Sequence, residues 1–247
     1  MINYLANPSN FLRFQRIATP VIGLVIFLTS LALGLWLSLY ASPADETQGE
    51  VVRIMYVHVP AAWGSMMAYT ALTIASITSF VWRHRLADSA ARAFAKVGIV
   101  FAFLALATGS IWGKPTWGTW WQWDGRTTSM LVFFFIYAAY LLIWSMVKPW
   151  NRAARLAAIL AMVGSINIPI IKFSVEWWSS LHQPATLSYI GAPGMPSELL
   201  RPLLMMAWAY ASLFAWASLM FIKADVMALR ARRQSSRPIS SVTIKKL

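Results

Sequence analysis

The sequence contains no cysteine and few charged residues. The absence of Cys from all 247 residues excludes disulfides, thiolate metal sites and cysteine nucleophiles. Charged side chains make up only 12% of the chain and hydrophobic side chains 59%, whereas soluble domains average about 25% charged and 45 to 50% apolar. Acidic residues are the scarcest, with eight Asp and Glu against 21 Lys and Arg. This composition predicts an integral membrane protein.

Six stretches are long and apolar enough to cross a bilayer as helices. A spanning segment must satisfy its own backbone hydrogen bonds, which requires a helix of about 20 mostly apolar residues. The first stretch is longer than the roughly 7 to 15 apolar residues of a signal peptide, so we expect an uncleaved anchor. Asn167 and Pro169 predict a kink in the fifth. The six stretches are residues 18–40, 60–82, 97–112, 129–147, 156–175 and 202–222.

No soluble domain and no internal repeat is evident, so we expect one all-α, six-helix membrane domain over residues 1–247. Sixteen of the 21 Lys and Arg residues lie on the side of both termini, seven of them in the tail 223–247. The positive-inside rule therefore predicts cytoplasmic termini. The net charge of +13 then indicates orientation, and we do not expect nucleic-acid binding. The tail sequence RARRQSSRP predicts a disordered basic extension near anionic lipid.

With this orientation, the stretch WGTWWQWD at residues 117–124 lies outside, between spans three and four. On a helix, Trp117, Trp120, Trp121 and Asp124 fall within about 100°, whereas a strand divides the tryptophans between two faces. We therefore expect a short helix in the membrane interface. An ordinary aromatic belt is the alternative, because Trp is common at this depth. The belt does not account for Asp124 or for the nearby Arg126.

Two of the three histidines also lie at the outer boundary. His58, in YVHVPAAW, precedes span two, and Pro60 predicts a helix that starts just after His58. His182 follows span five. Two imidazoles beside indoles and cations suit a haem with two axial histidines. A zinc site is one alternative; it needs three or four ligands, and only Asp124 or Glu176 could supplement the pair. Structural histidines bonded to backbone carbonyls are the other.

The stretch WGTWWQWDGRTT resembles the tryptophan-rich WWD signature of haem-handling proteins in cytochrome c biogenesis, W-G-x-x-W-x-W-D-x-R-L-T. Thr127 departs from it, standing where Leu is usual. The sequences GSIWGKPTWG, YVHVPAAW and NIPIIKFSVEWWSSLHQP are similar to the cytochrome c maturation protein C branch, whose modest length and six spans fit better than the larger WWD relatives. The matching residues are Trp117, Gly118, Trp121, Trp123, Asp124, Arg126 and Thr128.

This resemblance implies that haem b is held non-covalently at a periplasmic WWD segment, residues 112–128, between two axial histidines that map onto His58 and His182. It also implies a location in the bacterial cell inner membrane. The residues expected around haem are His58, His182, Trp112, Trp117, Trp120, Trp121, Trp123, Asp124 and Arg126.

The resemblance further implies that haem is presented to a membrane-anchored periplasmic haem chaperone. The expected partners are that chaperone, a small one-span maturation subunit, and an ABC-type ATPase with its membrane subunit. No Walker A pattern occurs, so we do not expect an enzyme, and any ATP use belongs to partners. A haem permease is the alternative function; it needs a polar path, and the spans offer little beyond Asn167. A cytochrome b-like quinol oxidase would need histidine pairs inside the spans.

Overall fold

The computed structural model describes residues 7–16, 18–178, 180–182 and 194–235. In these ranges the regular secondary structure is helical, with one isolated bridge between Asp45 and Gly49. Six helical segments are long and apolar enough to cross a membrane, which confirms the all-α architecture and the six spans; the sidedness stays a prediction from charge. The segments are Thr19–Ala41, Glu50–Trp82, Arg85–Trp117, Gly125–Met146, Trp150–Trp177 and Ser197–Arg232.

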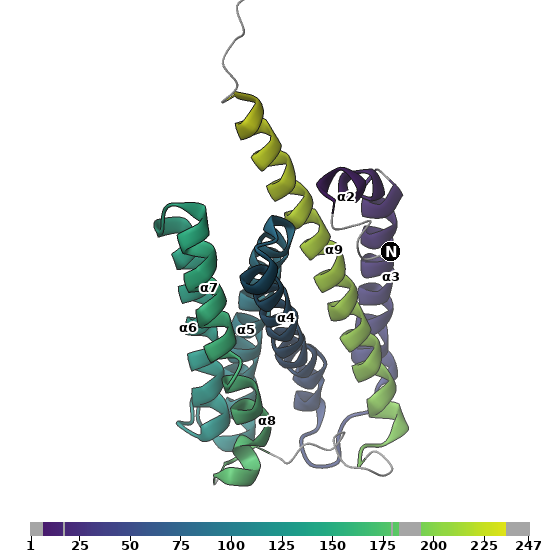
Figure 1. Cartoon of the computed structure of the whole chain (residues 1–247). Coiled ribbons are helices and arrows are strands. Elements are labelled where there is room, and N and C mark those ends of the chain that lie inside the picture. Colours follow the sequence, from purple (N-terminus) through teal and green to yellow (C-terminus); the bar gives the residue numbers. More distant parts are fainter. Residues whose placement is uncertain (1–6, 17, 179, 183–193, 236–247) are drawn as a thin grey trace, which may run out of the picture.

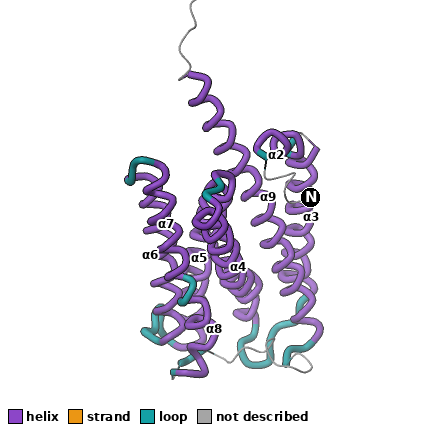
Figure 2. Tube along the Cα trace, in the orientation of Figure 1, coloured by secondary structure: helices purple, strands orange, loops and turns teal. Residues whose placement is uncertain are grey.

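Helices α4 and α5 form the centre of the bundle, with α3 and α9 on one side and α6, α7 and α8 on the other (Figure 1). The short α2 and the last turns of α9 lie at one end of the bundle, and the tube in Figure 2 places the loop after α5 and the end of α8 at the opposite end. The helices are α2 (Pro8–Phe14), α3 (Ala18–Trp36), α4 (Met55–Trp82), α5 (Arg85–Trp117), α6 (Gly125–Met146), α7 (Trp150–Gly164), α8 (Asn167–Trp177) and α9 (Ser197–Ser235), with a π-helical turn at Leu37–Ala41 and a 3-10 turn at Glu50–Ile54.

Three helices have ends that differ from the sequence-based expectations. Helix α4 begins at Met55, so the expectation that the helix starts after His58 is wrong. A 3-10 turn at Glu50–Ile54 leads directly into α4, and within it Arg53 pairs with Glu50 and donates to the Ser38 carbonyl at 2.5 Å. Helix α5 has 33 residues and extends well beyond the expected span at both ends. Helix α9 continues to Ser235, so the first part of the basic tail is helical, against the expectation of a disordered extension, and residues 236–247 lie outside the described ranges.

The fifth span is divided, as the kink prediction required. Helix α7 ends at Gly164 and α8 begins at Asn167. Pro169 lacks the N–H that would continue the helical ladder, and Asn167 Nδ2 donates to the Ser129 carbonyl of α6 at 2.8 Å. This change of direction lets the end of α8 pack against the start of α6, where a Cβ added to Gly125 would lie 3.0 Å from the Trp178 ring.

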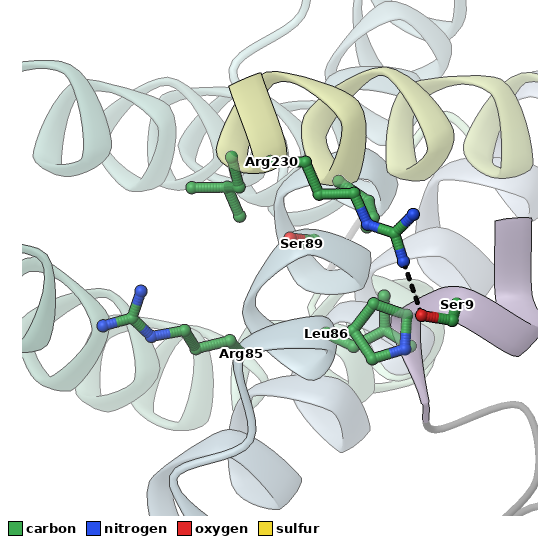
Figure 3. A pocket seen from close by; sticks show the side chains of 8 residues that line it. Ser9, Arg85, Leu86, Ser89 and Arg230 are labelled. Atoms are coloured by element: carbon green, nitrogen blue, oxygen red, sulfur yellow. Dashed lines mark hydrogen bonds between the residues drawn. The ribbon is translucent and has the colours of Figure 1, made fainter. Parts of the chain in front are cut away.

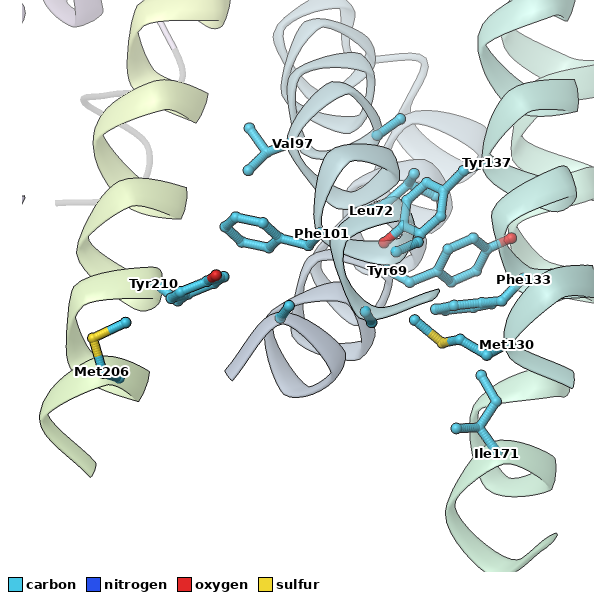
Figure 4. Packing of buried hydrophobic residues seen from close by; sticks show 14 of the residues in the cluster. Tyr69, Leu72, Val97, Phe101, Met130, Phe133, Tyr137, Ile171, Met206 and Tyr210 are labelled. Atoms are coloured by element: carbon cyan, nitrogen blue, oxygen red, sulfur yellow. The ribbon is translucent and has the colours of Figure 1, made fainter. Parts of the chain in front are cut away.

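Aromatic side chains fill the middle of the bundle (Figure 4). The ring centroid of Tyr69 lies 4.7 Å from that of Phe133 and 5.0 Å from that of Tyr137. The Tyr137 hydroxyl donates to the Ser65 carbonyl at 2.7 Å, so this buried polar group is satisfied. A Cβ added to Gly98 would lie 2.2 Å from the Tyr137 hydroxyl oxygen, so only glycine allows this approach. The packing fixes α4, α5 and α6, whose ends carry the candidate site.

Candidate haem site at one end of the bundle

The Trp-rich stretch is a loop between two helices. Helix α5 ends at Trp117, and Gly118 caps it in the left-handed conformation, with φ 79°, which favours glycine. Helix α6 starts after Asp124, whose Oδ1 accepts from the Thr127 N–H at 2.8 Å. The expected interfacial helix is therefore wrong: a helix stop and a helix start lie too close together to leave room for it, and of the tryptophans in this stretch only Trp117 is helical.

Asp124 is buried and holds His182 in one orientation. Only 3% of the Asp124 side chain and 17% of the His182 side chain are exposed, and His182 Nδ1 lies 2.8 Å from Asp124 Oδ2. Ser180 Oγ donates to the same carboxylate oxygen and accepts from the His182 backbone N–H at 3.1 Å. Because a carboxylate only accepts, Nδ1 carries the proton and Nε2 keeps its lone pair. The contact leaves His182 in the tautomer that ligates a metal through Nε2.

The protonation states agree with this arrangement. Burial raises the pKa of Asp124, but hydrogen bonds from Ser180, the Thr127 N–H and His182 outweigh it and bring that pKa to about 2. Burial lowers the pKa of His182 below its ordinary value, and the hydrogen bond to Asp124 opposes this shift only in part. At neutral pH the pair is therefore a carboxylate and a neutral imidazole, which is the form that binds iron.

His58 has a matching free nitrogen but a neutral partner. Its Nδ1 lies 3.2 Å from Thr108 Oγ1, and that hydroxyl donates its own proton to the Leu104 carbonyl at 2.5 Å. In the tautomer in which His58 Nδ1–H donates to this hydroxyl, Nε2 is unprotonated, and the Ala105 carbonyl is a second acceptor beside the ring. Gly109 makes room for the ring, because a Cβ there would lie 2.9 Å from His58 Cε1. The edge of Trp112 also packs on the ring, with centroids 5.6 Å apart.

The structure brings both histidines to one end of α5. His58 contacts Trp112, and the ring centroid of His182 lies 4.6 Å from that of Trp117. A further hydrogen bond, from Trp112 Nε1 to Gln48 Oε1 at 2.8 Å, connects the loop at residues 42–49 to this end of the bundle.

The remaining candidate residues surround the histidines with indoles and one cation. Trp120 and Trp123 are 59% and 73% exposed. Trp121 is half-buried, and its Nε1 has no hydrogen-bond partner among the residues that the structure describes. The Arg126 guanidinium likewise has no hydrogen bond or ion pair within that part of the chain, although the charges of Asp124 and Glu176 act on it. An indole N–H and a guanidinium without partners fit the carboxylates of a haem.

The described residues do not support the zinc alternative. Within them, no group of three or more His, Asp or Glu side chains could hold a metal ion. Glu176, which the sequence offered as a supplementary ligand, lies on α8, and Asp124 is already committed to His182 and Ser180. Two histidines with free Nε2 atoms suit a metal whose other ligands come from a porphyrin.

Three functional contacts were missed by the sequence-based reasoning. Ser180, Thr108 and Gln48 each hold a candidate site residue. Ser180 stands two residues before His182, and this spacing was the one local signal that could have found it. Thr108 and Gln48 carry no such signal, because their partners lie 50 and 64 residues away.

Comparison with known proteins identifies the family. The family model described as heme exporter protein C matches residues 1–237. Heme exporter protein C of Bradyrhizobium diazoefficiens is 46% identical over 228 residues, covering 92% of this chain and 86% of the relative. Heme exporter protein C of Haemophilus influenzae is 40% identical, covering 88% and 89%. A putative cytochrome c biosynthesis ccmC-like mitochondrial protein of Marchantia polymorpha is 42% identical, covering 84% and 86%.

These matches confirm the family resemblance seen in the Trp-rich stretch and its flanking sequences. The bacterial relatives and the six spans also agree with the expected multi-pass location in the bacterial cell inner membrane. This chain belongs to the heme exporter protein C family.

Proposed function

We propose that this protein holds haem at the bundle end that carries His58 and His182 and delivers it to a membrane-anchored periplasmic haem chaperone. Membership of the heme exporter protein C family implies haem handling in cytochrome c maturation. The single observation that carries the proposal is the shared state of the two histidines. Asp124 faces Nδ1 of His182 and Thr108 faces Nδ1 of His58, and we infer that both rings carry their proton on Nδ1 and offer Nε2 to iron.

The surrounding residues supply the other contacts that a non-covalently bound haem b needs. Haem as cargo brings the iron and the porphyrin plane, and His58 and His182 are the proposed axial ligands. The exposed indoles of Trp120 and Trp123 offer flat apolar surfaces for the porphyrin and for the chaperone that receives it. Arg126 and the Trp121 N–H pair with the propionates, because a buried carboxylate without a partner is costly.

The packed centre of the bundle supports delivery over the permease alternative. A permease needs a polar path between the two ends, but Tyr69, Phe133 and Tyr137 pack against one another between α4 and α6. Asn167, the polar residue that the sequence offered for such a path, is engaged with the Ser129 carbonyl. The route by which haem arrives then belongs to partner subunits.

The partner set rests on the family. We propose that the protein works with a small one-span subunit and with an ABC-type ATPase and its membrane subunit, which use the ATP. Lipid contacts the apolar outer faces of the helices, and α3 alone exposes Val21, Ile22, Val25, Ile26, Leu28 and Leu33 by 43 to 57%. No contact with nucleic acid is part of the proposal.

Absorption spectroscopy of the purified full-length protein, produced with abundant haem synthesis, tests the function. Wild type should show the spectrum of haem with two imidazole ligands. His58→Gly and His182→Gly should each reduce haem occupancy by about tenfold or more, with partial recovery on added imidazole. His84→Gly is the matched control. This third histidine precedes α5 at the other bundle end, and its side chain makes no capping hydrogen bond to that helix.

The same measurement can reject the proposal. Full haem retention with an unchanged spectrum in the His58→Gly, His182→Gly double variant would show that the two rings do not hold the iron. Equal haem loss in the His84→Gly control would show that the substitutions act through folding.

A further inference from the structure

A cavity of about 280 Å³ lies between α2, α5 and α9, at the bundle end opposite the candidate haem site (Figure 3). Two arginines line it, Arg85 from the start of α5 and Arg230 from α9. Leu86, Val226 and Leu229 form its apolar wall. The cavity therefore joins positive charge to an apolar surface at one place.

The lining includes a buried hydroxyl without a partner. Ser89 is 1% exposed, and its Oγ has no hydrogen-bond partner among the described residues. A serine within a helix can bond the carbonyl four residues earlier, but no such bond is present here. A buried hydroxyl left unpaired is unfavourable. The Ser89 hydroxyl is thus a donor without a partner at the cavity wall, and a ligand atom reaches it once the side chains that cover it move.

The positive charges at the cavity are not neutralised by the nearest acids of their own helices. On α5, Asp88 accepts from Ser79 and from Trp150 Nε1. On α9, Asp225 pairs with Arg92. Both carboxylates are therefore engaged elsewhere.

Two further features add positive potential at the cavity. Arg230 Nη2 donates to Ser9 Oγ at 2.8 Å, and this partner carries no charge. Helix α5 begins at Arg85 without a side-chain cap, so its first N–H groups and its dipole add positive potential. Together these features favour an anion.

We propose that this cavity binds the phosphate headgroup of an anionic phospholipid from the leaflet on the side of the two termini. Guanidinium groups match phosphate oxygens in geometry and charge. In Figure 3 Arg230 lies toward Ser9 and Arg85 extends the other way, so the proposal requires the Arg85 side chain to turn toward the phosphate on binding. Ser89 donates to a further oxygen, and the apolar wall contacts the lipid carbons. Free phosphate shares the headgroup chemistry, but it has no apolar part that would use this wall.

Thermal unfolding of the purified full-length protein in neutral detergent tests the site. Phosphatidylglycerol, phosphatidylcholine and inorganic phosphate are titrated separately, and the rise in melting temperature gives an apparent affinity for each. Phosphatidylglycerol should stabilise wild type most strongly. The variant R85Q/R230Q should bind it about 30-fold more weakly, from roughly a factor of five for each arginine.

Two further variants separate the cavity from general surface charge. R152Q/R155Q removes the same charge from α7 at the same bundle end and should behave like wild type. Ser89→Ala should lower phosphatidylglycerol affinity by about tenfold. Without lipid, Ser89→Ala should melt no lower than wild type, because its hydroxyl has no partner to lose.

Three results would overturn the proposal. An equal loss in R152Q/R155Q would assign the effect to surface charge alone. An equal response to phosphatidylcholine, or to inorganic phosphate, would show that an anionic lipid is not selected. Unchanged lipid binding in both Ser89→Ala and R85Q/R230Q would place any lipid outside this cavity.

Discussion

His182 and His58 lie at the same end of the bundle but are held by different partners. His182 Nδ1 faces the buried carboxylate of Asp124, whereas His58 Nδ1 faces the hydroxyl of Thr108. A hydrogen bond to an ionised acceptor is roughly twice as strong as one between neutral groups. It also makes the ligating nitrogen more basic. His182 is therefore the stronger of the two proposed ligands.

The difference follows from the backbone that carries each ring. His58 lies in the first turn of α4, where Trp112 and Gly109 of α5 already limit its position. His182 lies beyond the end of α8, in a segment without regular structure. A side chain on an irregular segment needs stronger contacts to stay in one orientation, and Asp124 and Ser180 provide them.

Asp124→Asn should have the largest effect. Asn keeps the α6 cap through its oxygen, but its amide then places a donor toward His182 Nδ1. The ring must shift its proton to Nε2, which is the wrong tautomer for ligating iron. We expect haem affinity to fall by about 10- to 100-fold, measured by haem titration of the purified protein.

Asp88→Asn is the matched control for this change. Asp88 is also buried, with 5% exposure, and accepts from Ser79 and Trp150 at the other bundle end. It should cost stability without changing the spectrum of bound haem. Wild-type haem affinity in Asp124→Asn would show that the carboxylate does not orient His182.

Acidification acts on the same pair without a mutation. Burial lowers the pKa of His182 below its ordinary value of 6.5, so the ring is neutral at pH 7 and is protonated only at lower pH. Asp124, with a pKa of about 2, remains a carboxylate throughout. Haem occupancy should stay constant from pH 8 to 7 and fall below pH 6.5.

The same lowered pKa has a consequence for stability. His182 in the unfolded chain has the ordinary pKa and binds a proton first, so acidification through this interval also favours unfolding. Circular dichroism at each pH should show that haem loss precedes loss of helix. Half-loss of haem above pH 7 would contradict the neutral imidazole assigned to His182.

Gly109→Ala tests the place that α5 gives to His58. The new Cβ would lie 2.9 Å from His58 Cε1, so the ring must move away from its contacts. Overpacking of this kind costs about 1 to 3 kcal/mol, and we expect haem affinity to fall by about tenfold. Gly23→Ala is the control, because its Cβ would approach Trp216 Cδ1 of α9 at the same 2.9 Å, away from the site. Equal haem loss in both variants would indicate a general loss of packing.

Much of the fold could be predicted from sequence because hydrocarbon imposes a strict rule. Apolar length alone located six spans, and Asn167 with Pro169 located the break in the fifth. The helix ends were harder, because they depend on single residues. Gly118 and Asp124 are ordinary stop and start signals, yet the spacing of the tryptophans favoured a helix through both.

The candidate site was predictable only as far as unusual residue types mark it. His58, His182 and Asp124 stand out in any reading of the chain, but their supporting contacts do not. Thr108 is one of several threonines within spans, and only the packing of α4 on α5 brings it to His58. Such contacts depend on how two helices are rotated against each other, which apolar patterning leaves open.

Thr108→Val should have the smallest effect and defines the difference between the two histidines. Valine keeps the shape but removes the acceptor for His58 Nδ1, a neutral hydrogen bond worth about 0.5 to 1.5 kcal/mol. The helix still holds the ring between Trp112 and Gly109. Haem affinity should therefore fall by only about three- to tenfold, and Thr108→Ser, which keeps the hydroxyl, should stay close to wild type. A loss in Thr108→Val as large as in Asp124→Asn would show that a neutral hydroxyl supports its histidine as strongly as a carboxylate does. The two rings would then be equivalent ligands.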